Sequence, residues 1–294
     1  MMAGVRYPAR RRFLMAALSA LASAPVWAAA PTPASPQRIA SLNLSADEIL
    51  VEILPAERLV AVTRWADEAG TSNVVGLVPA AAYRFVKADL ERLVALHPDL
   101  VVVSEYTDAD FLHLLQRSGL RYHRMTGLGS PSGVRTAILD LGRAVGTQDR
   151  AQKLVARYDR ILGELQRRLA GVKRPRVLYW SSGMTAGADS AIGAMIETAG
   201  AVNLGRELGV GGIAPPGAER AFAADPDLIL VGSWPGAEAS VKSHPLLGQS
   251  RAVREGRILT MPNELLVALS QYTAEGCWHL AFRLHPDRIP GPRP

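Results

Sequence analysis

Apolar residues are arranged in two ways along this chain, at helical spacing and in short continuous runs, and each arrangement predicts one kind of element. Between residues 147 and 171 the apolar positions recur about every 3.6 residues, which is typical of one long amphipathic helix. Thr147 is expected to cap this helix and Gly171 to end it. A helix of that length would reach roughly 35 Å, so it can bridge two lobes. An ordinary surface helix is the alternative.

Short, continuously apolar runs lie on both sides of the long helix and predict strands buried in parallel sheets. The predicted strands are residues 38–42, 59–63, 100–103, 120–125, 176–180, 228–231 and 257–261. Helical patterns separate them, with Ser45 expected to cap the first helix and another helix expected around 245–253. This βαβ alternation predicts an α/β fold with mainly parallel sheets.

The two sides of the long helix repeat each other. Residues 89–106 align without a gap with residues 217–234, and Glu91 aligns with Glu219. In each copy a short helix that opens with glutamate stops at a Pro-Asp turn and passes into an apolar strand. Two copies around one helix predict two lobes with a cleft between equivalent strand ends, which is where open α/β sheets bind ligands.

The N-terminal 28 residues predict a signal peptide. They have a basic start, an apolar run and a small-residue cleavage site ending at Ala28. The sequence around Arg10, Arg11 and Arg12 resembles a twin-arginine export signal, and a general secretory signal is the alternative. The expected domains are a signal peptide at 1–28, a linker at 29–37, an N-terminal α/β lobe at 38–146, the bridging helix at 147–171, a C-terminal α/β lobe at 172–286 and a tail at 287–294.

Composition and charge narrow the class of protein. The chain is 48% hydrophobic and 20% charged, as in soluble globular proteins. Its net charge of +6 includes four arginines of the signal, and without them 29 basic residues face 27 acidic ones, a balance of +2. This gives no reason to expect nucleic acid as a partner. No apolar run after the signal is long enough to span a bilayer, so no stable membrane insertion is expected.

The cysteine count bears on location. Cys277 is the single cysteine, so the chain has no intramolecular disulfide and no cysteine for lipid attachment near the cleavage site. An exported protein without an anchor stays near its cell only if an outer membrane retains it. We therefore expect the protein in the periplasm of a Gram-negative bacterium. Separately, we expect it to be a monomer.

Motifs for catalysis and metal binding are missing from the sequence. It has no nucleophile elbow, dinucleotide fingerprint or phosphate loop, and Cys277 is expected to be a small buried hydrophobe. None of the six histidines pairs with another at metal-ligand spacing, although histidines from separate loops could still converge on zinc or manganese. We expect no catalytic step, no resident metal and no cofactor. An exported two-lobe α/β enzyme is the alternative class.

Aromatic and polar residues gather at predicted strand ends and in connecting loops. Large apolar sites fixed by a few polar groups bind flat or bulky organic ligands. The candidate ligand-binding residues are Arg64, Trp65, Tyr83, Arg84, Tyr106, Trp180, Trp234 and Asn263. Packing between loop and lobe is the alternative for each tryptophan.

Glu91 and Glu219 open the two repeated helices, and two interpretations remain open. Acids at helix N-termini are stabilised by the helix dipole, which alone could explain both. Their repeat-related positions would also place one carboxylate on each lobe, suited to a two-fold partner that carries arginines.

These motifs together resemble the periplasmic binding proteins for vitamin B12 and ferric siderophores. The resemblance rests on the strand at 38–42 with its capped helix, the two Glu-Arg…Pro-Asp-Leu segments and the long middle helix, and it covers about residues 37–286. It implies a class III periplasmic binding protein: two α/β lobes joined by one rigid helix, with limited hinge closure, serving an ATP-driven ABC importer.

The resemblance also implies roles for single residues. Glu91 and Glu219 match the family's glutamates that dock to arginines of the membrane permease. Trp65 is similar to the aromatic that stacks on ligand, and the loops of Tyr106, Trp180 and Trp234 fall where the family lines its cleft.

Two departures bear on the ligand. The chain has Tyr83-Arg84 and Glu105-Tyr106 where some B12 binders have tryptophans, and Arg64 and Arg84 would suit an anionic chelate. The expected ligand is a metal chelate, either a ferric siderophore or a cobalamin-type corrinoid. A haem receptor with Tyr106 as the axial ligand is the alternative.

Overall fold

In the computed structural model, residue 1 and residues 35–291 are described. The predicted signal peptide and most of the predicted linker fall outside this range, so the cleavage site and the twin-arginine signal stay predictions. Among the described residues, no helix combines the length and hydropathy that crossing a membrane requires.

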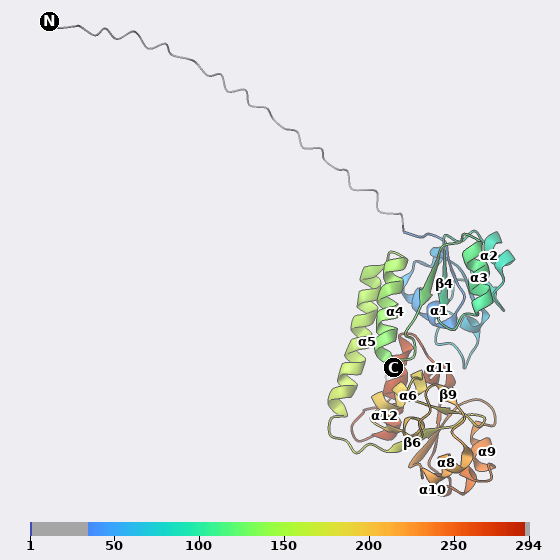
Figure 1. Ribbon diagram of the computed structural model, residues 1–294, viewed down its shortest axis with the longest axis vertical. Helices are drawn as coiled ribbons and strands as arrows, with labels where there is room; N and C mark the ends of the chain where they lie inside the picture. Colours follow the sequence, from blue (N-terminus) through green and yellow to red (C-terminus); the bar gives the residue numbers. More distant parts are fainter. Residues whose placement is uncertain (2–34, 292–294) are drawn as a thin grey trace. The chain divides into compact units, whose positions relative to one another are not determined.

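The N-terminal lobe is built on a five-stranded, wholly parallel sheet with the order β3-β2-β1-β4-β5 (Figure 1). Its strands are β1 (Ile39–Ser41), β2 (Leu59–Thr63), β3 (Tyr83–Phe85), β4 (Leu100–Ser104) and β5 (Tyr122–Met125). Its helices are α1 (Leu44–Ile53), α2 (Leu90–Ala95), α3 (Ala109–Arg117) and α4 (Pro131–Ala144), with 3₁₀ turns η1 (Ala56–Arg58) and η2 (Arg64–Asp67). The α/β prediction with parallel sheets is confirmed.

Two local predictions in this lobe are wrong. Asn43, and not Ser45, caps α1, because the Asn43 Oδ1 accepts the Ala46 N–H at 2.9 Å while Ser45 already lies within the helix. The strand β3 is missing from the strands predicted above. It is only three residues long and lies at the sheet edge with an arginine in the middle, so no apolar run marks it.

The helix α5 (Gln148–Arg168) joins the two lobes and is slightly shorter than the expected 147–171. Its apolar stripe is buried against α4, α1 and the last helix of the chain, as the 3.6-residue period predicts. Thr147 stands at the N-cap position, but its hydroxyl makes no capping hydrogen bond, so that prediction is wrong.

The C-terminal lobe has a four-stranded parallel sheet with the order β11-β10-β6-β8 and a separate antiparallel pair, β7 with β9. Its strands are β6 (Arg176–Tyr179), β7 (Thr185–Ala186), β8 (Val202–Asn203), β9 (Ile213–Ala214), β10 (Leu228–Gly232) and β11 (Ile258–Met261). Its helices are α6 (Ala191–Thr198), α7 (Leu204–Glu207), α8 (Ala218–Ala223), α9 (Ala237–Lys242), α10 (Arg251–Arg254), α11 (Asn263–Leu266) and α12 (Tyr272–Leu284), with the 3₁₀ turn η3 (Leu247–Gln249).

The expected helix around 245–253 is wrong as a single element. Helix α9 ends before the His244-Pro245 step, and η3 and α10 follow as separate short turns. The backbone is extended at Ser250, which ends η3 and caps α10 by accepting the Val253 N–H, so no single helix runs through residues 245–253.

The end of the chain packs against the bridge. Helix α12 lies against α5 and α6, and beyond it the side chain of Ile289 is fully buried. The indole Nε1 of Trp278 donates to the carbonyl of Gly291 at 3.0 Å. Residues 287–291, assigned to a tail from sequence, therefore belong to the packed structure.

The sequence repeat is also a structural repeat. Helix α2 and strand β4 have the same lengths and spacing as α8 and β10. The turn residues His97 and Asp225 occupy equivalent places and both have positive φ, at 47° and 44°. In each copy the aspartate after the proline, Asp99 or Asp227, accepts an N–H at the start of the neighbouring strand, from Arg38 just before β1 or from Arg176, the first residue of β6.

Candidate functional site

A hollow of about 360 Å³ lies at the carboxyl edge of the N-terminal sheet. Because β1, β2, β3 and β4 are parallel, the residues that follow them meet at this edge. The hollow is lined by Leu42, Asn43, Leu44, Thr63, Trp65, Phe85, Val86, Lys87, Ala88, Ser104, Tyr106, Thr107 and Asp108. The structure thus brings two predicted site residues, Trp65 and Tyr106, into one concave site.

Trp65 is presented on the turn η2, and two arginines hold it there. The side chain is 38% exposed, and the Arg64 guanidinium lies 4.0 Å from the centre of its ring. Arg84 pairs with Asp67, the last residue of the same turn, at 2.7 Å. Arg84 therefore supports the turn that carries Trp65, and neither arginine lines the hollow.

Tyr106 stands at the mouth of the hollow, just after β4, and is 65% exposed. Partial burial and then the neighbouring Glu105 carboxylate raise the pKa of its phenol above the usual value. The side chain therefore offers a neutral hydroxyl and a ring face to a ligand.

Asp47, in α1, is buried beside the hollow and ties that helix to the carboxyl end of β2. Its Oδ2 accepts the backbone N–H of Thr63 at 3.0 Å and the Thr63 hydroxyl at 2.5 Å. Burial raises the pKa of Asp47 to about 7, although hydrogen bonds from Ser41 and Thr63 act to lower it. Asp47 lies in the first turn of α1, where the helix dipole favours an acid, so its sequence position alone gives no sign of burial.

A second buried carboxylate, Glu48, connects the lobes. It accepts the backbone N–H and side-chain amide of Asn73 at 2.9 and 2.8 Å, and a short hydrogen bond from the hydroxyl of Ser270, ahead of α12. Asn73 also donates to the carbonyl of Glu264 at 2.9 Å. This set, Glu48 with Asn73, Ser270 and Glu264, is called the Glu48 clamp below.

The other predicted ligand-binding residues lie elsewhere. Tyr83 is on the edge strand, 4.9 Å from the ring of Phe85, and does not line the hollow. Trp180 is only 4% exposed in the C-terminal core, edge-to-face with His244. Trp234 is half-buried between the two cores. Trp180 therefore packs in the core and does not line the hollow, which agrees with packing, the alternative given for each tryptophan.

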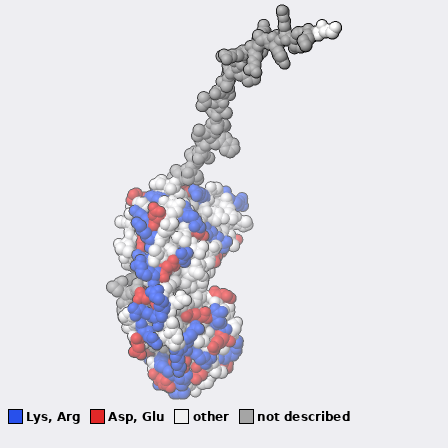
Figure 2. Space-filling model, turned by 90° about the vertical axis from the view of Figure 1, so that its left-hand side faces the viewer, with Lys and Arg blue, Asp and Glu red and all other residues white. Residues whose placement is uncertain are grey.

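Asn263 lies where the lobes touch. Its backbone N–H donates to Ser233 at 2.9 Å, and its amide donates to the carbonyl of Gly70 at 3.3 Å. Seen from the side of α5, the surface is hollowed between the lobes along one edge, and positive and negative side chains are interspersed (Figure 2).

Several lining residues were missed from sequence. Phe85, Lys87, Ser104 and Thr107 all lie at or just after the carboxyl ends of β3 or β4. Phe85 went unnoticed because β3 did, and small polar residues carry no signal of their own. Their position at the end of a strand was the available clue.

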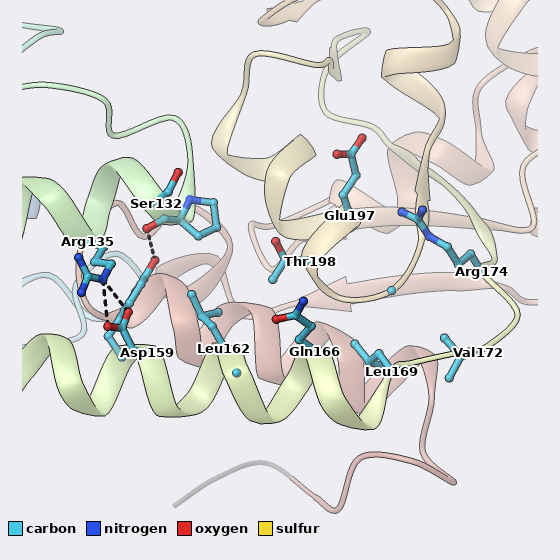
Figure 3. A pocket seen from close by; sticks show the side chains of 15 residues that line it. Ser132, Arg135, Asp159, Leu162, Gln166, Leu169, Val172, Arg174, Glu197 and Thr198 are labelled. Atoms are coloured by element: carbon cyan, nitrogen blue, oxygen red, sulfur yellow. Dashed lines mark hydrogen bonds and ion pairs between the residues drawn. The ribbon is translucent and has the colours of Figure 1, made fainter.

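A larger cavity, of about 700 Å³, runs along α5 beside the N-terminus of α4 and the C-terminus of α6 (Figure 3). Several of its polar side chains already have partners. Arg135 pairs with Asp159 at 2.9 Å, Glu197 pairs with Arg206, and the Tyr158 hydroxyl donates to the carbonyl of Pro131. The smaller hollow at the strand ends, with its exposed aromatics, is therefore the better candidate for ligand.

Glu91 and Glu219 are both exposed in the first turn of their short helices. Within residues 35–291, neither carboxylate forms an ion pair. Figure 1 shows α2 and α8 in different lobes.

The described residues contain no cluster of three or more histidine, cysteine or acidic side chains that could hold a metal ion. Cys277 is fully buried in α12, and burial raises the pKa of its thiol to about 12. The interpretation of Cys277 as a buried hydrophobe is confirmed.

Two α/β lobes with parallel sheets, joined by one long helix, define the class III fold of substrate-binding proteins. The chain belongs to the periplasmic binding protein family, whose model matches residues 39–265.

The chain is also similar to individual proteins in sequence or in structure. A cobalamin-binding protein of Halobacterium salinarum is 27% identical over 215 residues, which is 67% of this chain and 54% of that protein, so the chain matches about half of its length. A periplasmic haem-binding protein of Roseiflexus sp. RS-1 superposes with a TM-score of 0.74 at 22% identity, covering 85% of this chain and 98% of that one. A molybdate-binding periplasmic protein of Haemophilus influenzae gives 0.74 at 20% identity, covering 86% and 87%.

Proposed function

We propose that this protein is the periplasmic receptor of an ABC importer and carries a metal chelate, a ferric siderophore or a cobalamin-type corrinoid, to its permease. The observation that carries the proposal is the hollow at the strand ends, lined by Trp65 and Tyr106, in a chain of the periplasmic binding protein family. The similarity to a cobalamin-binding protein supports this ligand class. The N-terminal signal supports export, and a receptor of this kind needs no catalytic step.

The ligand class is tested by quenching of tryptophan fluorescence with cyanocobalamin, ferrichrome, ferric enterobactin and haemin. We expect saturable quenching by at least one of the first three. Trp65→Ala should weaken that binding by about 1 kcal/mol or more, because the exposed ring offers a face for stacking. Tyr83→Ala is the matched control, since Tyr83 is equally exposed in the same lobe but outside the hollow. If both variants lowered ligand affinity equally, the role of Trp65 would be packing and not ligand binding.

A haem receptor is the second candidate. Tyr106 supports it, because an exposed tyrosine at the mouth of the hollow could ligate haem iron. Its raised pKa works against it, since ligation to ferric iron favours the phenolate. A haem absorption band on mixing with haemin that disappears in Tyr106→Phe would favour this candidate over the first.

Delivery to the permease is assigned to Glu91 and Glu219. Each exposed carboxylate lacks an ion-pair partner within residues 35–291 and can accept a guanidinium, which forms stronger, often bidentate pairs. Glu91→Ala and Glu219→Ala should each impair uptake in proteoliposomes while ligand affinity stays unchanged. Exposed Glu57, in η1, serves as the control position. If both variants weakened ligand binding instead, the docking assignment would be wrong.

A further inference from the structure

The short helices α2 and α8 present the same surface pattern in both lobes. Residues 90–98 and 218–226 largely agree, position by position, in which side chains are buried and which are exposed. Leu93 and Ala221 point into their lobes and are fully buried, whereas the glutamates stand outside. The two helices therefore display equivalent faces to solvent.

Each of these faces carries an exposed apolar side chain beside its glutamate. Val94 is 47% exposed and Phe222 is 38% exposed, and both follow the glutamate by three residues. Residues three apart on a helix are surface neighbours. A single exposed apolar residue needs no explanation, but the same exposure at repeat-related positions of two lobes does.

Among the described residues, neither neighbouring arginine forms an ion pair with its glutamate. The Arg92 guanidinium lies 5.3 Å from the centre of the Tyr83 ring, and Arg220 donates to the carbonyl of Leu208. Beside Glu91, a hollow of about 270 Å³ is bounded by Asp89, Arg92 and Ala95. The N-terminal face thus combines an exposed carboxylate, an adjacent depression and an apolar neighbour.

We infer that the permease binds each lobe through one charged and one apolar side chain, Glu91 with Val94 and Glu219 with Phe222. The occupant is a two-fold-symmetric permease dimer in which each subunit presents an arginine next to an apolar contact. Equivalent faces on two lobes match a partner with two equivalent surfaces. The inference rests on the proposed docking role and adds an apolar contact to each carboxylate. Phenylalanine is larger than valine, so the C-terminal face contributes more.

The test uses the full-length receptor and the permease complex that supports receptor-dependent uptake, held in nanodiscs, with binding measured at low and at about 0.5 M salt. Phe222→Ser should weaken permease binding about tenfold, and Val94→Ser less. Val75→Ser is the matched control, because Val75 is a valine that is 46% exposed outside both faces. Ligand affinity should stay unchanged in all three variants.

Salt separates the two parts of the contact. The loss in Phe222→Ser should persist at high salt, whereas the loss in Glu219→Ala should shrink there, because salt screens exposed charges. If Phe222→Ser behaved like Val75→Ser while the glutamate variants lost binding, the apolar contact would be refuted and the docking role would stand. If no variant lost binding, the docking role itself would fail.

Discussion

The buried carboxyl group of Asp47, beside the ligand hollow, is expected to make the stability of the fold depend on pH. Burial raises its pKa to about 7 from 3.8. A carboxyl group whose pKa is higher in the folded than in the unfolded chain stabilises the fold fully at low pH and loses that contribution as the pH rises through the folded pKa. The contribution of Asp47 should therefore fall between about pH 4 and pH 7.

Chemical denaturation of Asp47→Asn and wild type between about pH 4 and pH 8 tests this. As the pH rises, the difference in unfolding free energy should move in favour of the variant, by about 1.4 kcal/mol per pH step of one between the unfolded and folded pKa values. Asp110→Asn is the control, because Asp110 is an exposed acid in the first turn of α3. A difference for Asp47→Asn as flat as the control would mean that Asp47 stays charged throughout.

For single residues, the sequence identified the exposed residues of the site better than the buried ones. Trp65 and Tyr106 could be found because an aromatic directly after a strand reaches the sheet edge. Trp180 follows a strand as well, yet it turns into the core against His244, which is distant in sequence. Asp47 and Glu48 could not be found, because their partners come from other strands and from residue 270.

Helices α4 and α5 approach closely at one glycine, and this contact gives a matched pair of substitutions. A Cβ at Gly142 in α4 would lie 2.3 Å from the Cβ of Ala151 in α5. Gly163, in the interior of α5, has nothing nearer than 3.7 Å to such a carbon. The first glycine is required by packing, and the second is not.

Gly142→Ala should lower the free energy of unfolding by about 1–3 kcal/mol, because the helices must separate. Gly163→Ala should raise it by about 0.5–1 kcal/mol, because alanine is the better helix former. Urea denaturation of the two variants checks both signs. Equal changes would show that α4 and α5 are not closely packed at residue 142.

Elements with a strong internal period were predictable, and short ones were not. The 21-residue helix α5 and the repeated helix-strand units follow from spacing alone. The edge strand β3 and the turns η3 and α10 have three or four residues each, too few for a period to show. Their conformation depends on neighbours that only the folded chain supplies.

On the scale of the whole described unit, the Glu48 clamp is expected to limit how far the lobes move. Its hydrogen bonds tie α1 and residue 73 to the segments at 264 and 270, so opening the lobes must strain or break them. Glu48→Ala removes the shared acceptor and leaves buried donors unpaired, at a cost on the order of 2 kcal/mol. The lobes should then sample more separations.

Spin labels at exposed positions 117 and 239, one in each lobe, would measure this as a distance distribution. The distribution should broaden in Glu48→Ala and stay as in wild type in Glu57→Ala, which changes an exposed acid of η1. Identical distributions in both variants would show that the rigidity comes from α5 and not from the clamp.

The last helix in the sequence packs on the bridge in the middle of the molecule. During translation, α1 and α4 are available to cover part of the apolar stripe of α5, but roughly a hundred residues must follow before α12 can cover the rest. The joint between the lobes is therefore completed only after α12 has been made, and a nascent chain that stalls before it would carry a long helix whose apolar stripe is only partly covered.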